Sequence, residues 1–311
     1  MSDTPPKVEG CSNRGQLDDV VSLCDSAFAD TGREYFERHV RLDRTIRPED
    51  TRVLFRDGTL VSSVQVFPRR SYVKGTIVET GGIGNVATLP AERRKGYAEA
   101  VLKDAIAYMV SRKWQVSLLT TKINSYYEKF GFKTINRELA LSEPRRSVTH
   151  PTIRIFEKGR DLEAVSRLYE EYNAGLVGPF VRDPLYWSSQ LDFCDEDKSL
   201  FLVYDIGNEI VSYVRAKRKP DRTSVMEYAF SAGHENCQHK LFEHLHFIAG
   251  MKPLEVYMTL DEKAVLAYLK VLDIRVESEL MINFLDDDLD ESRREILLKD
   301  NGFTFWLTDF F

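Results

Sequence analysis

Hydrophobic residues in the first quarter of the chain follow two periods in turn. Apolar residues recur at helical spacing over Leu17–Phe28, with aspartates on the opposite face, and a second helical segment covers Glu34–Leu42. Two apolar runs, Val53–Phe55 and Leu60–Phe67, then flank an Asp-Gly pair, which is typical of a tight hairpin turn. This part of the chain therefore predicts two helices followed by two antiparallel strands.

The next segments alternate between strand and helix. A strand is predicted at Thr76–Thr88, where three internal glycines indicate a bulge or the close approach of another backbone. A helix follows Pro90, a strand covers Gln115–Thr120, and a short helix at Ser125–Phe130 ends at Gly131, a residue suited to a left-handed cap. The order of elements predicts a mixed α/β fold.

The second half of the chain resembles a weakened copy of the first. The helical stripe over 162–168 repeats that over 17–23, Ile210–Val214 repeats Leu60–Val64, and a Gly-Asn turn precedes it as the Asp-Gly turn precedes its counterpart. A linker without apolar periodicity spans Ser142–Pro151. We therefore predict tandem domains at residues 1–145 and 151–285, the second degenerate, and a C-terminal tail at 286–311. The aromatic tail Phe303–Phe311 is too apolar to stay in water, so we expect it to dock.

Composition and charge exclude several classes of function. The 311 residues are 43% hydrophobic and 30% charged, as in an ordinary globular protein, and their net charge of -6 provides no positive field for nucleic acid. We find no secretory leader and no apolar stretch of membrane-spanning length, so we expect a cytoplasmic protein with no membrane partner. The same composition is compatible with a homo-oligomer.

Cysteine and histidine spacing gives no metal site. The four cysteines are far apart, as expected of reduced thiols. The histidines between His234 and His246 do not share one helical face in a way that forms a tetrahedral set. We therefore expect no metal.

The segment Gly84–Ala98 carries the most specific chemistry. The pattern predicts a strand, a basic turn with Arg93, Arg94 and Lys95, and then the first residues of a helix. Gly96 gives the backbone conformational freedom where the helix begins. Unpaired amides at a helix N-terminus, with the helix dipole, bind anions, so a diphosphate would fit here. Taken alone, the same segment could be no more than a solvated helix start.

Two motifs in register resolve that choice. Arg93-x-x-Gly96-x-Ala98 resembles the Q/R-x-x-G-x-G/A acetyl-CoA motif of the GNAT superfamily of N-acetyltransferases. Asn124-Ser125-Tyr126-Tyr127-Glu128-Lys129-Phe130-Gly131-Phe132 resembles the N-x-x-(Y/F)-Y-x-x-x-G-F segment of the same superfamily. The resemblance covers Leu17–Leu141 well and the remainder only as a weak repeat. The tandem arrangement is distantly similar to the Eis-like (enhanced intracellular survival) acetyltransferases.

The resemblance implies roles for individual residues in binding acetyl-CoA. The backbone around the basic turn would hold the pyrophosphate, the preceding strand would pair with pantetheine amides and polarise the thioester carbonyl, and an asparagine would bind the pantetheine arm. These cofactor-binding residues are Val86, Ala87, Thr88, Arg93, Arg94, Lys95, Gly96, Tyr97, Ala98, Glu99 and Asn124.

The resemblance also implies a general acid and leaves the general base open. Tyr127 takes the position of the acid that protonates the departing thiolate, although a core aromatic on a short helix is the alternative. Glu79, on the strand that leads to Gly84, is one candidate base. The terminal carboxylate at Phe311 is the other, because Eis-like relatives use theirs.

The second copy lacks both motifs. Ser231–Glu235 contains no R-x-x-G-x-G/A, and Ala267–Ile274 places Leu269 opposite Tyr127. We expect it to bind no cofactor and to form one wall of an acceptor pocket between the domains. The predicted function is transfer of an acetyl group from acetyl-CoA to a small-molecule or peptide primary amine by direct attack. The alternative is a non-catalytic acyl-CoA-binding module that senses or assembles.

Overall fold

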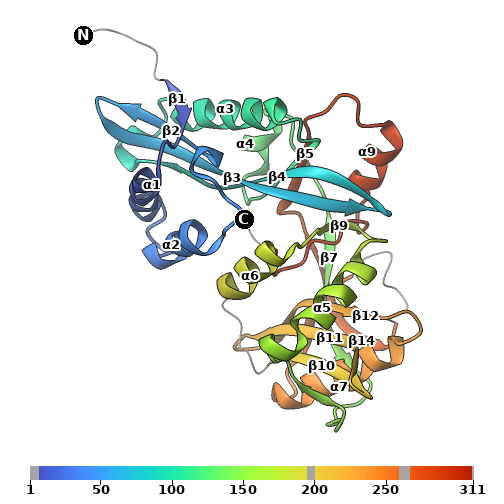
Figure 1. Cartoon of the computed structure of the whole chain (residues 1–311). Coiled ribbons are helices and arrows are strands. Elements are labelled where there is room, and N and C mark those ends of the chain that lie inside the picture. The colour runs from blue at the N-terminus through green and yellow to red at the C-terminus, as the bar shows by residue number, and fades with distance from the viewer. Residues whose placement is uncertain (1–6, 195–199, 259–266, 310–311) are drawn as a thin grey trace.

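A computed structural model describes residues 7–194, 200–258 and 267–309 (Figure 1). The helices are α1 (Arg14–Ala27), α2 (Arg33–Leu42), α3 (Tyr97–Ser111), α4 (Asn124–Glu128), α5 (Lys158–Asn173), α6 (Pro184–Phe193), α7 (Glu235–Ile248) and α9 (Glu291–Leu298), with 3-10 turns at Pro48–Asp50 and Pro90–Glu92. The strands are β1 (Val8–Gly10), β2 (Thr51–Arg56), β3 (Thr59–Val73), β4 (Thr76–Thr88), β5 (Val116–Thr120), β6 (Lys133–Thr134), β7 (Arg137–Pro144), β8 (Ile153–Ile155), β9 (Val177–Phe180), β10 (Phe201–Ile206), β11 (Glu209–Arg218), β12 (Thr223–Phe230), β13 (Leu254–Met258), β14 (Leu269–Glu277) and β15 (Leu280–Phe284).

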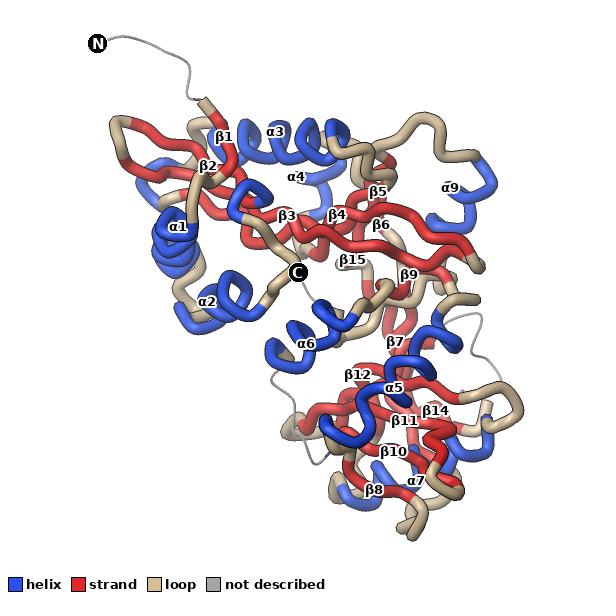
Figure 2. Tube along the Cα trace, in the orientation of Figure 1, coloured by secondary structure: helices blue, strands red, loops and turns tan. Residues whose placement is uncertain are grey.

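Two mixed sheets confirm the predicted α/β class, and they form two bodies compatible with tandem domains (Figure 2). The first sheet has the order β1-β2-β3-β4-β5-β15-β6, with β9 beside β3. The second has the order β14-β7-β13-β12-β11-β10-β8. Each contains three antiparallel strands, then a helix, then a parallel strand: β2-β3-β4-α3-β5 in the first and β10-β11-β12-α7-β13 in the second.

The local predictions in the first half agree with the observed elements. The predicted strand at Thr76–Thr88 has the bounds of β4, and both hairpin turns form with positive φ at Asp57, Gly58, Gly207 and Asn208. These φ values suit the two-residue turns whose twist matches that of the flanking strands. Gly131 has φ of +92°, in the left-handed region, as predicted for the end of the short helix.

The two sheets exchange strands along the chain. Strand β7, from the first half, pairs with β13 and β14 in the second sheet, and β15 returns to the first sheet between β5 and β6. The segment expected to mirror the Tyr127 helix is instead strand β14, so the alignment of Leu269 with Tyr127 is wrong. The predicted linker is also shorter than expected, because β7 continues to Pro144.

The exchange means that the sheets do not follow the predicted ranges 1–145, 151–285 and 286–311. Strand β7 belongs to the first range but pairs in the second sheet, and β15 belongs to the second range but pairs in the first sheet. The division into domains therefore stays a proposal about units of the chain.

Helices cover both faces of the first sheet. Neighbouring residues of β2 point to opposite sides, so Val53 packs with α1 and α2 while Leu54 packs with α3. The side that carries α3 also includes Tyr127 and Met281 of β15. None of the described helices has the length and hydropathy needed to cross a bilayer.

The described part of the tail docks, as its composition predicts. Phe303 and Phe305 pack in the core under the first sheet, and Trp306 packs in the core of the second. The Trp306 indole donates to the Asn173 side-chain oxygen at 2.7 Å. The tail therefore joins the two bodies.

Candidate functional site

The first sheet opens between β4 and β5. These parallel strands pair from Thr80 and Val116 to Ile83 and Leu119, and no pair is found beyond that point in these two described strands. Asn85 follows with φ of +49°, where the register between β3 and β4 shifts. A bulge of this kind turns the strand locally. The end of β4 is thereby directed away from β5.

The helix that follows β4 begins at an unusual turn. Arg94 has φ of +64° and Gly96 has φ of +83°, and Gly96 is the N-cap of α3 without any side-chain cap. A Cβ at Gly96 would meet nothing within 4 Å, so backbone conformation requires the glycine rather than crowding inside the protein. The uncapped amides of the first helical turn can accept an anion.

A cavity of about 430 Å³ lies against this turn, and we call it the turn cavity. It is lined by Val86, Thr88, Glu92, Arg93, Arg94, Gly96, Tyr97, Ala98, Glu99, Ile123, Tyr126, Tyr127 and Lys129. Eight of these were predicted to bind the cofactor, and Tyr127 was predicted to act as the acid. The local motif therefore brings its residues to one cavity.

The side chains of the basic turn are partly committed to the protein. Arg93 donates to the Ala27 carbonyl oxygen at 2.8 Å, and Lys95 pairs with Glu92 at 2.9 Å. Lys129, which the sequence analysis did not select, lines the turn cavity and pairs with Glu99 at 3.2 Å. The uncapped backbone amides at the start of α3, together with the Arg94 side chain that also lines the turn cavity, could therefore bind an anion.

Three predicted cofactor residues do not line the turn cavity, namely Lys95, which pairs with Glu92, and Ala87 and Asn124. Ala87 is buried against the α1 side of the sheet, so only its backbone could reach a ligand. The Asn124 amide nitrogen donates to the Thr134 hydroxyl at 2.7 Å and to the Ser278 carbonyl at 2.8 Å. This side chain therefore ties α4 to β6 and the end of β14, and only its carbonyl oxygen could still accept from pantetheine.

Tyr127 separates the turn cavity from a second cavity of about 400 Å³, which we call the middle cavity. The two cavities share Val86, Ile123 and Tyr127. Tyr127 is 9% exposed, and burial, with a smaller effect of Tyr126, raises its pKa to about 12. Its phenol therefore keeps its proton at neutral pH.

Strand β15 contacts the C-terminal end of helix α4, the helix that carries Tyr127. The Asn283 side chain donates to the Phe130 carbonyl at 3.0 Å, and a Cβ at Gly131 would meet the Asn283 side-chain oxygen at 2.9 Å. A residue more than 150 positions away thus fixes the end of α4. No local sequence pattern predicts this support.

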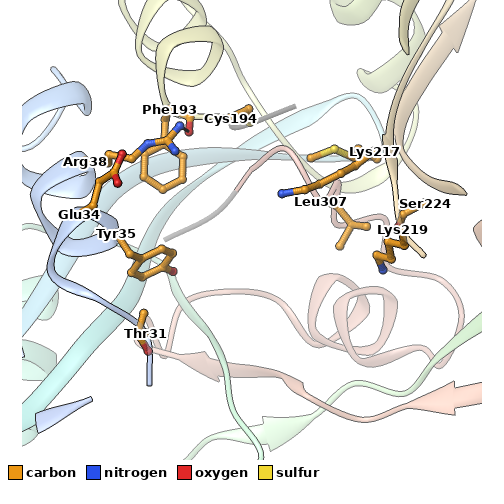
Figure 3. Close-up of a pocket in the computed structure, with 11 residues that line it drawn as sticks. Thr31, Glu34, Tyr35, Arg38, Phe193, Cys194, Lys217, Lys219, Ser224 and Leu307 are labelled. Carbon is orange, nitrogen blue, oxygen red and sulfur yellow. Dashed lines mark hydrogen bonds between the residues drawn. The ribbon is translucent and has the colours of Figure 1, made fainter. Parts of the chain in front are cut away.

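The middle cavity lies beside a larger space between the two sheets. Beyond the shared residues, it is lined by Phe28, Thr31, Tyr35, Phe36, Ile83, Gly84, Asn85 and Leu119–Thr121. Thr31 and Tyr35 also line a cavity of about 530 Å³, the intersheet cavity (Figure 3). The connection between α1 and α2 therefore borders both spaces, a role that the sequence analysis missed.

Of the two candidate bases, Glu79 is the one that lies in the described residues, and it is not beside Tyr127. Glu79 is exposed and lines a separate cavity with Arg69 and Arg70, six residues along β4 from Asn85. At about 3.3 Å per residue this is about 20 Å. The structure therefore does not bring Glu79 to the site. Phe311 lies outside the described residues.

The expectation that the protein binds no metal can be compared only with the side chains that the structure describes. Within residues 7–194, 200–258 and 267–309, no group of three or more His, Cys, Asp or Glu side chains is arranged to hold a metal. His150 instead pairs with Glu243 at 2.9 Å, and His246 contacts the Ser147 hydroxyl at 3.1 Å.

The comparisons with known proteins agree with this geometry. A family model described as an acetyltransferase (GNAT) domain matches residues 12–135. No curated protein sequence matches the chain.

Solved structures of low identity share the fold. A probable N-acyltransferase from Enterococcus faecalis has a TM-score of 0.71 at 17% identity, over 91% of this chain and 73% of that one. Eis1 from Mycobacterium abscessus has a TM-score of 0.62 at 14% identity, over 90% and 74%. The N-myristoyltransferase of Saccharomyces cerevisiae, solved with myristoyl-CoA, has a TM-score of 0.58 at 12% identity, over 98% and 87%.

Proposed function

Since a family model described as an acetyltransferase (GNAT) domain matches residues 12–135, we propose that the protein transfers an acetyl group from acetyl-CoA to a primary amine by direct attack in a ternary complex. The domain family and the fold support acyl transfer from an acyl-CoA in general. The acetyl donor, the amine acceptor and the direct mechanism are the parts that we propose.

One observation carries the proposal: Tyr127 stands at the boundary between the turn cavity and the middle cavity. The diphosphate would bind the amides of residues 94–99, and the pantetheine arm would follow Val86 and Thr88 into the gap between β4 and β5. The thioester would then lie next to Tyr127. The amine would enter from the middle cavity on the other side.

The chemistry requires one proton to be donated and one to be removed. The amine nitrogen attacks the thioester carbonyl carbon, the C–S bond breaks, and the thiolate takes the phenol proton of Tyr127. A backbone amide near Val86 would stabilise the oxyanion. A raised pKa suits this role because the phenol is protonated at the start of each turnover.

We propose the terminal carboxylate of Phe311 as the group that takes the amine proton. The described residues that line the middle cavity include no carboxylate. Support comes from the docked tail, since Leu307 lines the intersheet cavity and Asp309 is held by Arg182 at 2.8 Å. Glu79 is not retained.

A thiol-release assay with acetyl-CoA and a panel of amines tests the function, together with calorimetry of CoA binding. Turnover with at least one amine is expected. Binding of CoA without thiol release from any amine would favour the non-catalytic module instead. A parallel series with acetyl-CoA, octanoyl-CoA and myristoyl-CoA tests the preference for the acetyl group.

A further inference from the structure

The intersheet cavity has one wall from each body and an apolar middle. Helix α2 contributes Tyr35, α6 contributes Phe193, β12 contributes Met226, and the tail contributes Leu307 (Figure 3). Its volume of about 530 Å³ is that of a small-molecule site. The side chains favour a ligand with an apolar body.

Positive charge is concentrated at the second-sheet wall and opposite it. Lys217 and Lys219 line the cavity from the β11 side, and Arg38 lines it from α2, while Glu34 is the one carboxylate among the lining residues that the structure describes. Lys219 is already neutralised by Glu255 at 2.6 Å. The Arg38 guanidinium donates to the Phe193 carbonyl oxygen.

Lys217 differs from these neighbours. Its side chain has no ion pair and no hydrogen bond to the described residues, Lys217 as a whole is exposed, and its ammonium end points across the cavity toward the side of Tyr35 and Arg38 (Figure 3). An ammonium group without a protein partner can bind an anion without first breaking another ion pair. The site therefore offers a cation to whatever enters.

The position of Lys217 relative to Tyr127 determines the shape of a ligand that would contact both residues. The intersheet cavity meets the middle cavity at Thr31 and Tyr35, and Tyr127 borders the middle cavity. One elongated molecule could place its amine near Tyr127 and its other end near Lys217. A polycation would place a second positive charge against Lys217 and Arg38.

We propose, building on the proposed function, that the acceptor is an elongated primary amine with an apolar body and an anionic group, and that Lys217 binds this anion. A short hydrophobic peptide with a free C-terminal carboxylate is the simplest member of this class, and an amine that carries a phosphate shares the same chemistry. Polycationic amines are poor acceptors on this account.

Paired acceptors that differ only in the anion test the proposal. Phenylalanyl-leucine is compared with its C-terminal amide, and tyramine phosphate with tyramine, which separates carboxylate from phosphate. We expect kcat/KM for the anionic member of at least one pair to exceed that of its neutral partner by about tenfold or more, as a charge-assisted contact gives.

Variants assign the preference to Lys217. Lys217→Ala should reduce the ratio to near one, Lys217→Glu should invert it, and Lys217→Arg should keep it. Lys270→Glu, an exposed lysine on β14, changes the net charge equally and should leave the ratio unchanged. A ratio near one for both pairs in the wild type, or a ratio that survives Lys217→Glu, would overturn the proposal.

Calorimetry separates this proposal from the proposed function. The same pairs are titrated into protein saturated with CoA, and the anionic member should bind about tenfold more tightly in the wild type and lose this advantage in Lys217→Glu. This pattern without thiol release supports the binding proposal and contradicts the enzyme. Turnover of the neutral amines, with no preference for the anionic member of either pair, would support the enzyme and contradict the binding proposal. Absence of binding by all four compounds would overturn the role of Lys217.

Discussion

Arg182 and Asp309 form an ion pair inside the protein, with a guanidinium nitrogen 2.8 Å from a carboxylate oxygen and both side chains at most 1% exposed. The same guanidinium contacts Glu227 of β12 at 2.5 Å, and the Tyr186 hydroxyl donates to Asp309 at 3.1 Å. A residue of the tail, one of the segment before α6 and one of the second sheet thus share one network. It fixes the tail beside the intersheet cavity.

Removal of Asp309 should destabilise the protein strongly. In Asp309→Ala, the buried Arg182 guanidinium keeps Glu227 as a partner but loses the second carboxylate that balances its charge. Loss of one partner of a buried ion pair lowers the free energy of unfolding by about 3–5 kcal/mol. The free energy of unfolding is measured by denaturant titration. Asp287→Ala, at an exposed carboxylate, is the matched control and should change it by less than about 0.5 kcal/mol. Equal effects in the two variants would contradict the role of the network.

His39 predicts a pH dependence of stability. Burial lowers its pKa from 6.5 to about 4, so the folded state keeps the ring neutral while the unfolded chain takes up a proton below pH 6.5. Stability is therefore lost as the pH falls from about 6.5 to about 4, by about 3 kcal/mol for this group.

The variant His39→Phe isolates this contribution. His39 packs among Tyr35, Phe67 and Phe193, so a phenylalanine suits the site. Unfolding free energies of both proteins are compared at pH 7 and pH 4, and the variant should lose less stability. Parallel curves would show that His39 is not responsible.

Gly96 should contribute to cofactor binding through its lack of a side chain as well as through its backbone conformation. Gly96→Ala forces alanine into φ of +83°, at a cost of about 1–2 kcal/mol, and adds a methyl group at the turn cavity. We expect CoA affinity to fall about tenfold or more by calorimetry. Gly75→Ala carries the same type of backbone strain at the β3–β4 turn, with φ of +82°, and should leave CoA affinity unchanged.

The pKa of Tyr127 predicts the alkaline limit of the reaction. A pKa of about 12 keeps the phenol protonated up to about pH 11, so its deprotonation should cause no loss of kcat between pH 8 and pH 10.5. The measurement is kcat at saturating amine across this range. A fall with an apparent pKa near 10 that disappears in Tyr127→Phe would contradict the buried environment of this residue.

The sequence predicts most of the residues that line the turn cavity because they are close together in the chain. The turn at 93–96, the following helix and Tyr127 are positioned by local signals, namely a glycine with positive φ, a helical stripe and a short helix ended by Gly131. Glycine and helical periodicity act over a few residues, so they can be recognised without the fold.

Distant pairings explain what the sequence could not predict. The local sequence patterns of β7 and β15 do not specify which sheet each strand joins, so the exchange of strands could not be predicted. Asn283 reaches α4, and Lys217 and Met226 reach the intersheet cavity, only because of that packing. Glu79 was selected for its nearness in sequence to Gly84, but an extended strand carries it away from the site.

The most direct test of acyl transfer at Tyr127 is the rate of thiol release from acetyl-CoA by Tyr127→Phe, with Tyr126→Phe as its neighbour control in the same cavity. The account predicts that kcat falls about 100-fold or more in Tyr127→Phe, in keeping with loss of a general acid, while CoA affinity is unchanged and Tyr126→Phe stays near the wild type. An unchanged kcat in Tyr127→Phe would contradict it.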